Sequence, residues 1–560
     1  MGLAAVAAVL LWLVLARGTL PGWVLGVPAA AFLVLVVWHD RVLQRHRRAA
    51  RAVAFFEQGL ARLSDTWPGT GETGDRFLAP DHPYAADLDL FGRGSLFELL
   101  TTARIRAGEE TLARWLLEPA PGASVRERQV AVRELQPRLD LREDLALLGE
   151  DEGAGVHPAL LSRWANGIPL VTSRWPQAAA LALSATAAAT AVAWAAGVTG
   201  PGPFVLAVLI EGAFALGLRG RVRRILHEVE APARDLALLS GVLARFEQEA
   251  FEAPALVGIR TRLETDGLAP SRRVAQLQRL IDLANSRQNQ IFAPFAALLL
   301  WGTQVALAIE RWRVRYGRGL PGWLDAVGEF EALCSLAGYA YEHPKDPMPE
   351  VEDAGPLFDG EAIAHPLLPD SKAVCNSVRL GSDTRMLLVS GSNMSGKSTM
   401  LRTVGSNTVL ALAGAPVRAQ RLRLSPLAVG ATLRVQDSLQ AGQSRFYAEI
   451  TRLRHIVALT AGPLPVLFLL DELLSGTNSH DRQHGAEAIV RGLLERGAVG
   501  LVTTHDLALS AIADRLPGAV NVHFADEFEE GSLRFDYRMR PGIVRTSNAL
   551  ALMRAVGLDV

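Results

Sequence analysis

The sequence contains little cysteine and little lysine, and each shortage narrows the possible chemistry. The two cysteines among 560 residues, Cys334 and Cys375, are too few for a disulfide framework. No Cys/His cluster indicates a zinc site. The three lysines, Lys345, Lys372 and Lys397, stand among many arginines. With 57 basic and 58 acidic residues the net charge is −1, so a nucleic-acid site would have to be a local patch.

Charge is nearly absent from two long stretches of a chain that is 49% hydrophobic, with a mean hydropathy of +0.19. Residues 1–38 comprise two apolar runs around a Gly/Pro-rich turn, and an arginine cluster follows. Residues 176–210 carry no charge and have arginines on both sides. Because arginines concentrate on the cytoplasmic side of membrane segments, we predict a multi-pass protein of the cytoplasmic membrane with two helical hairpins. For the first stretch, an in-plane anchor or a buried hairpin is the alternative.

A Gly-rich segment dominates the second half of the chain. It reads G-x-x-x-x-G-K-S from Gly391 to Ser398, with an apolar strand (386–389) before it and a helical run (399–412) after it. Such a loop points backbone N–H groups at phosphate, and the helix N-terminus adds its positive end. Lys397 can then reach the β- and γ-phosphates, and Ser398 can bind Mg²⁺. The predicted ATP-binding residues are Gly391, Ser392, Asn393, Met394, Ser395, Gly396, Lys397, Ser398 and Thr399.

Two later apolar segments end in polar side chains. Residues 466–470 lead into Asp471 and Glu472, and residues 500–504 lead into His505. We predict that Asp471 joins Ser398 at the metal and that Glu472 orients the attacking water. His505 is placed to contact the γ-phosphate. The candidate catalytic residues are Lys397, Glu472 and His505. The alternative for the acidic pair is a solvated strand end, and the alternative for His505 is an ordinary loop histidine.

These segments resemble the MutS family of ATPases. Residues 391–399 are similar to its loop GPNMGGKST, including the inner Asn-Met pair. Residues 437–449 resemble D-D-L-x-x-G-x-S-T-F-M-x-E, and residues 471–481 resemble D-E-x-x-x-G-T-S-x-x-D. Thr504-His505 matches a T-H pair. His365-Pro-Leu and Asn376 resemble the start of the family's ATPase domain, so the likeness covers essentially all of residues 360–560.

The resemblance implies an α/β P-loop ATPase domain with a mostly parallel sheet, preceded by an all-α core and lever region. It also implies a homodimer with composite sites, in which Ser444 contacts the ATP of the partner subunit. DNA, mismatched or structured, is the implied ligand. The family's mismatch-recognition domain has no counterpart here, because membrane hairpins occupy the region before the core. An F-x-E string at 55–57 matches the family's mismatch reader by letters only.

The predicted organisation follows from these segments. The domains are an N-terminal membrane hairpin (1–40), an amphipathic helix and linker (41–86), a first core/lever part (87–176), a second hairpin (177–218), a second lever part (219–345) and the ATPase domain (346–560). We interpret the uncharged residues 291–309 as a packed helix, because one extra crossing would put the ATP site outside the cell. Glu211, in the second hairpin, is either functional or, as we favour, close to the interface.

Two functions remain open. In the first, a membrane-tethered ATPase binds DNA through arginine-rich helices. The arginines considered are Arg260, Arg262, Arg272, Arg273, Arg279 and Arg287. In the second, nucleotide-driven closure of the dimer acts on a membrane or protein partner without DNA. A solvated helix face is the alternative explanation of those arginines.

Overall fold

The computed structural model describes residues 2–17, 20–148, 158–171, 173, 175–230, 236–264, 269–286, 292–392, 394–434, 445–474, 479–529 and 532–544. The chain divides into two compact units, residues 1–61 and residues 62–560, and each is described by itself.

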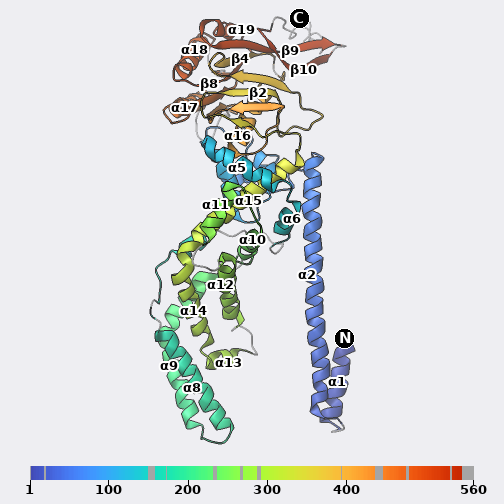
Figure 1. Cartoon of the computed structure of the whole chain (residues 1–560), viewed down its shortest axis with the longest axis vertical. Coiled ribbons are helices and arrows are strands. Elements are labelled where there is room, and N and C mark those ends of the chain that lie inside the picture. Colours follow the sequence, from blue (N-terminus) through green and yellow to red (C-terminus); the bar gives the residue numbers. More distant parts are fainter. Residues whose placement is uncertain are drawn as a thin grey trace. The chain divides into compact units, whose positions relative to one another are not determined.

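The N-terminal unit contains the first apolar stretch. α1 (Gly2–Leu15) is followed by the short turn η1 (Gly22–Leu25) and by α2 (Gly26–Leu63), which Figure 1 shows in dark blue. α1 has 14 residues, fewer than the roughly 20 that a spanning helix needs. α2 is apolar at its start and arginine-rich beyond it, so the second arm of the predicted hairpin and the predicted amphipathic helix form one continuous helix of 38 residues.

In the larger unit, both predicted core/lever parts pack around a single helix. α15 (Leu320–Glu342) is buried along most of its length and packs against α4 (Arg106–Leu117), α5 (Gly122–Leu135) and α11. Gly328 allows the close approach to α4, because a Cβ there would lie 2.6 Å from the carbonyl oxygen of Ala107. The remaining helices of this region are α3 (Leu96–Leu100), α6 (Leu139–Leu147), α7 (Pro158–Ala165), α10 (Leu236–Gln248), α11 (Pro254–Leu263), α12 (Pro270–Asn285), α13 (Ala293–Leu298) and α14 (Trp301–Tyr316).

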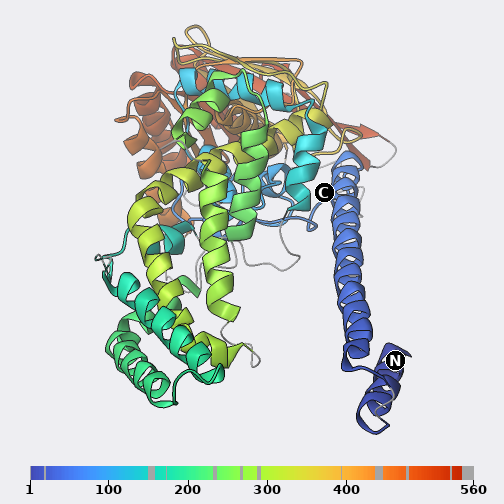
Figure 2. The same ribbon diagram turned by 60° about the horizontal axis from the view of Figure 1, so that its bottom comes forward.

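The second apolar stretch forms two adjacent antiparallel helices, α8 (Trp175–Ala195) and α9 (Gly202–Glu230), which lie side by side in Figures 1 and 2. α9 continues as a helix past residue 218 into its arginine-rich end. By length and composition, three segments of described helix could cross a membrane: Trp23–Leu63, Trp175–Ala195 and Gly202–Val229. The run 291–309 is interrupted near Leu300, which has a φ of +46°, so its described part forms two helices, α13 and α14.

The C-terminal domain is α/β, as predicted. Its main sheet has the order β10-β9-β4-β8-β7-β6, parallel except for β10. A smaller sheet has the order β1-β5-β2-β3. The main strands are β4 (Met386–Ser390), β6 (Ala428–Thr432), β7 (Val466–Leu470), β8 (Val499–Thr504), β9 (Ala519–Glu529) and β10 (Ser532–Pro541). The smaller sheet contains β1 (Glu350–Val351), β2 (Phe358–Ile363), β3 (Asn376–Leu380) and β5 (Arg421–Leu424).

Helices cover both faces of the main sheet. α17 (Arg445–Leu459) and α18 (Ser479–Glu495) bury apolar side chains against one face, together with α19 (Leu507–Ser510). α16 (Lys397–Ala413) contacts β7 and β8, and it also packs against α4 and α5. α16 is therefore shared by the sheet and the helical region, so the helix that starts at the predicted phosphate loop is also part of the contact with the lever.

Candidate functional site

The predicted phosphate loop lies at the carboxyl end of β4. All five residues of this strand are buried, which fits a central position between β8 and β9. Gly396 has a φ of +101° and directly precedes α16, which begins at Lys397. A side chain at Gly396 would be strained by this φ and would also bring its Cβ to 3.1 Å from the ring of Tyr537. The loop thus delivers the positive end of a 17-residue helix to the sheet edge.

Lys397 lies folded onto the loop. Its Nζ donates hydrogen bonds to the carbonyl oxygens of Gly391 and Ser392, at 2.9 and 2.8 Å. Burial lowers the pKa of the ammonium group, and the carboxylates of Glu472 and Asp471 act in the opposite direction. The ammonium group therefore interacts electrostatically with both carboxylates and supplies a positive charge at the loop.

Two loop hydroxyls fit an anionic ligand. The Oγ atoms of Ser392 and Ser395 are buried and have no hydrogen-bond partner among the described residues. A buried donor without a partner costs free energy, so a group rich in acceptor oxygens would stabilise this loop. These two serines stand where the MutS loop has Pro and Gly. Met394 and Thr399 are exposed, Ser398 is half-buried in the first turn of α16, and Asn393 lies outside the described residues.

The predicted acidic pair follows a strand that is buried throughout, β7. The hydroxyl of Thr503 donates to Oδ1 of Asp471 and accepts from the backbone N–H of Glu472 at 2.9 Å. Thr503 of β8 therefore orients both acidic residues, a role that the sequence interpretation missed. The run of polar residues at the end of β8, Thr503-Thr504-His505, was the sequence feature that could have indicated this role. Glu472 has a φ of +47°, unusual for a residue with a side chain, and such strain is concentrated at functional sites.

His505 lies next to the acidic pair, as expected from the neighbouring parallel strands. Its Nδ1 is 3.4 Å from Oε1 of Glu472, and both side chains are partly open to solvent. The structure thus brings Lys397, Asp471, Glu472 and His505 to one edge of the sheet. Ser444, the residue expected to act on the partner's ATP, lies outside the described residues.

The side chains of the site include a hydroxyl and a carboxylate, the kinds of oxygen ligand that Mg²⁺ prefers. Mg²⁺ is usually held by one or two protein oxygens and by phosphate oxygens and water, without a dedicated protein cage. Ser398 and Asp471 would supply those protein oxygens. Among the described residues no group of three or more His, Cys, Asp or Glu side chains could hold a metal alone.

Two further residues support the backbone near this site. Buried Glu449 of α17 accepts from the backbone N–H of Leu474 at 2.6 Å, just after the acidic pair. Asn376 donates to the carbonyl oxygen of Tyr537 at 2.9 Å and accepts from the N–H of Met539 at 2.7 Å. It therefore fixes the irregular part of β10 whose Tyr537 ring covers Gly396.

His365 is a structural residue in this domain. Burial, with the nearby Arg402 and Arg418, lowers its pKa to about 4. Its Nδ1 accepts from the N–H of Leu367 at 3.2 Å, which requires the neutral ring. The resemblance had placed His365 at the start of the ATPase domain, and the structure gives it a role in fixing the backbone there.

Several of the arginines considered for DNA are engaged by neighbouring residues of the helical region. Arg262 pairs with Glu329, Arg260 donates to the carbonyl oxygen of Glu249, and Arg273 is buried beneath Tyr316. Arg272 and Arg279 are exposed, and Arg287 lies outside the described residues. Ion pairing and packing thus occupy three of the six candidates.

Comparison with known proteins agrees with the geometry. A family model described as MutS domain V matches residues 387–559. The chain is 34% identical over 292 residues to "Endonuclease MutS2" of Thermus thermophilus. The aligned region covers 50% of this chain and 38% of that protein. It is 33% identical over 243 residues to "DNA mismatch repair protein MutS 2" of Halobacterium salinarum, 42% of this chain and 27% of that protein. The chain therefore spans well under half the length of these relatives.

Proposed function

We propose that this chain, which belongs to the MutS family through its domain V, is a membrane-tethered ATPase that acts on DNA as a homodimer. The observation that carries the enzymatic part is the convergence of Lys397, Asp471, Glu472 and His505 at one sheet edge, next to a loop with two unsatisfied buried hydroxyls. In this proposal the loop and Lys397 hold the phosphates of ATP. Ser398 and Asp471 hold Mg²⁺, which supplies charge neutralisation at the phosphates.

Glu472 is proposed to orient the attacking water, and Thr503 holds its backbone for that task. His505, whose Nδ1 is 3.4 Å from Oε1 of Glu472, is proposed to contact the γ-phosphate. A contact of Ser444 with the partner's nucleotide would make the spacing of the two subunits depend on bound ATP. α16 runs from the phosphate loop to α4 and α5, which provides a path from nucleotide state to the helical region.

DNA as the ligand is supported by the names of the relatives and by the family of domain V. The direct test is ATP hydrolysis by the purified full-length protein with and without duplex, mismatched and branched DNA. We expect at least one DNA structure to change the turnover rate. Binding of that DNA should weaken linearly on a log–log plot against salt, with a slope of about −0.9 for each phosphate contacted in duplex DNA. Absence of binding to every structure at low salt would reject the DNA part and leave the ATPase part intact.

A second function is favoured by one observation, the internal engagement of Arg260, Arg262 and Arg273. In that case closure of the dimer acts on a membrane or protein partner without DNA. The two functions differ in what copurifies with the protein in detergent, since membrane proteins free of nucleic acid would indicate the second.

Tethering to the cytoplasmic membrane gives a separate prediction. Its support is the apolar composition of α2, α8 and α9 and the arginines that follow the apolar parts of α2 and α9. We expect the full-length protein to stay in the membrane fraction through high-salt and alkaline washes and to be released by detergent. Release by salt alone would indicate peripheral binding, and recovery in the soluble fraction would contradict tethering altogether.

A further inference from the structure

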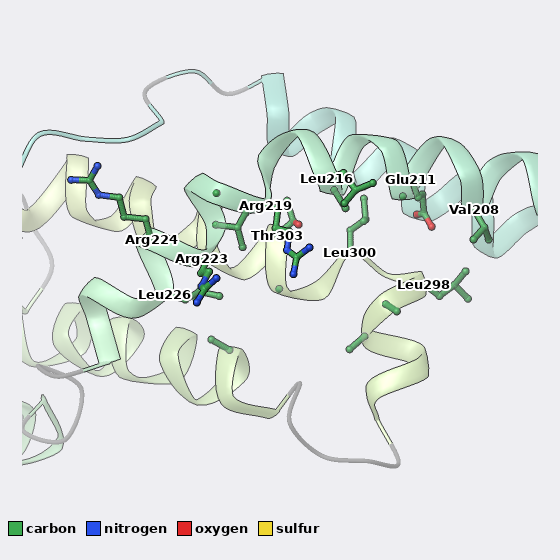
Figure 3. Close-up of a pocket in the computed structure, with 18 of the residues that line it drawn as sticks. Val208, Glu211, Leu216, Arg219, Arg223, Arg224, Leu226, Leu298, Leu300 and Thr303 are labelled. Carbon is green, nitrogen blue, oxygen red and sulfur yellow. The ribbon is translucent and has the colours of Figure 1, made fainter.

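A large cavity lies beside the second apolar hairpin. Its volume is about 1490 Å³, above the range of roughly 300–1,000 Å³ that is typical of small-molecule sites. α9 forms one wall, and Ile281 of α12, Leu298 of α13 and Thr303 of α14 contribute to the other side (Figure 3). The cavity is therefore built where α9 leaves the apolar hairpin and meets the helical region.

The two ends of this cavity differ in chemistry. Val208, Leu209 and Leu216 line the end that belongs to the apolar part of α9, and Arg219 and Arg223 line the other end, as Figure 3 shows for all but Leu209. Arg219 and Arg223 are four residues apart and so share a face of the helix. A ligand that fills the cavity must carry an apolar chain at one end and an anion at the other.

The two arginines are available for such an anion. Both are exposed, and neither forms an ion pair or hydrogen bond with a described residue. Arg224, also on the cavity wall, is engaged by Glu228 at 2.9 Å. Guanidinium groups recognise phosphate through parallel N–H donors, which makes a phosphate diester a suitable partner.

Glu211 lies within the apolar part of the cavity wall, between Leu209 and Leu216. It is 3% exposed, and its Oε1 has no hydrogen-bond partner among the described residues. It lies eight residues before Arg219, roughly 12 Å along the helix at 1.5 Å per residue. A bound headgroup at the arginines would therefore stay well away from this carboxyl, so the charge of Glu211 does not oppose the anion.

We propose that this cavity binds an anionic phospholipid of the cytoplasmic leaflet, with its phosphate on Arg219 and Arg223 and an acyl chain along Val208, Leu209 and Leu216. The proposal rests on the membrane tethering proposed above. It goes beyond general attraction of arginines to an anionic surface, because it assigns the lipid to two arginines out of a cluster. Arg221 is equally exposed and in the same cluster, but it does not line the cavity.

The test uses the full-length protein in phosphatidylcholine nanodiscs that contain a minor fraction of phosphatidylglycerol. After transfer to detergent, mass spectrometry measures the ratio of the two lipids retained by the protein. We expect enrichment of phosphatidylglycerol. Arg219→Gln and Arg223→Gln should each lower the enrichment by roughly tenfold, because each removes a charge-assisted hydrogen-bond donor to the bound phosphate. Arg221→Gln removes the same charge and should leave it unchanged.

A second pair of variants tests the acyl chain. Gly212 lines the cavity, and a Cβ there meets no atom within 4 Å, so a side chain can start at this position, and Gly212→Phe places a ring in the apolar end. Gly217 has the same open surroundings but does not line the cavity, so Gly217→Phe is the matched control. We expect Gly212→Phe alone to abolish the enrichment. Dissolved glycerol phosphate should not displace the lipid, because it lacks an acyl chain.

Three results would overturn the lipid site. These are no enrichment with the parent protein, equal losses for Arg221→Gln and Arg219→Gln, and displacement by glycerol phosphate, which would indicate a site for phosphate alone. Enrichment that survives Gly212→Phe would likewise exclude the cavity. Failure of the parent protein to enter nanodiscs would instead contradict the membrane tethering, so the two proposals fail in different measurements.

Discussion

Replacement of Glu472 by glutamine is expected to lower ATP turnover by about 100-fold or more while ATP still binds. The amide keeps the size of the side chain but cannot accept a proton or polarise water as a carboxylate does, and general-base contributions are roughly 10²–10⁴-fold. Thr503 should keep the backbone of Glu472 in place, since it binds the main-chain N–H at 2.9 Å. The measurement is steady-state release of phosphate, with the dissociation constant for ATP determined in parallel.

Glu495→Gln is a suitable control for this prediction. Glu495 is exposed at the end of α18, so the substitution removes the same charge from the same domain away from the site. Its turnover should equal that of the parent protein. Lys397→Ala should differ in kind, because the loss of the ammonium group weakens ATP binding itself. Equal turnover of Glu472→Gln and the parent protein would remove Glu472 from its proposed role.

The residues whose placement was predicted from sequence are those whose positions follow from local order along the chain. An apolar strand, a Gly-rich loop and a helix in succession place Lys397 and Ser398. The rule that carboxyl ends of parallel strands share an edge brings Asp471, Glu472 and His505 to them. These positions need no knowledge of distant contacts. The α/β class of the C-terminal domain was predictable for the same reason.

What was missed depends on register and long-range pairing. Thr503 could be assigned only once β7 and β8 were aligned, with Leu470 opposite Val502. Tyr537 reaches Gly396 because Asn376 holds an irregular part of β10, more than 160 residues away in the chain. The partners of the arginines considered for DNA could not be predicted, for a related reason. Counting charges on a helix does not reveal that Arg262 has Glu329 as its partner.

Asp87 is the residue outside domain V whose substitution is expected to affect the ATPase site most. Its side chain is fully buried between the helical region and the sheet. Oδ1 accepts from the N–H groups of Leu433 and Arg434, both at 2.7 Å, and Oδ2 pairs with Arg452 at 2.7 Å. These partners flank residues 435–444, the segment that contains Ser444. A residue of the helical region therefore holds the backbone directly before the segment proposed to reach the partner's ATP, and a side chain of α17, the helix that follows it.

Asp87→Asn should destabilise the folded protein by about 3–5 kcal/mol, the usual cost of removing one member of a buried ion pair. The amide leaves Arg452 without its counter-charge and turns an N–H donor toward another donor. Asp89→Asn is the matched control. Asp89 pairs with Arg402 and Arg434 but is partly exposed, and such pairs contribute about 0–1 kcal/mol. Unfolding midpoints of the full-length proteins in one detergent, by denaturant titration, compare the two.

The double substitution Asp87→Asn with Arg452→Met separates two effects of losing the carboxylate. One is the loss of the ion pair with Arg452, and the other is weaker hydrogen bonding to the N–H groups of Leu433 and Arg434. Without the guanidinium, the unpaired buried cation is gone, so part of the stability should return relative to Asp87→Asn alone. A second role for Asp87 would be to position the segment that contains Ser444. In that case this partly restored protein should still hydrolyse ATP slowly, because the introduced amide binds the N–H groups of Leu433 and Arg434 less strongly than a carboxylate does. Full recovery of both stability and turnover would show that Asp87 serves only to neutralise Arg452.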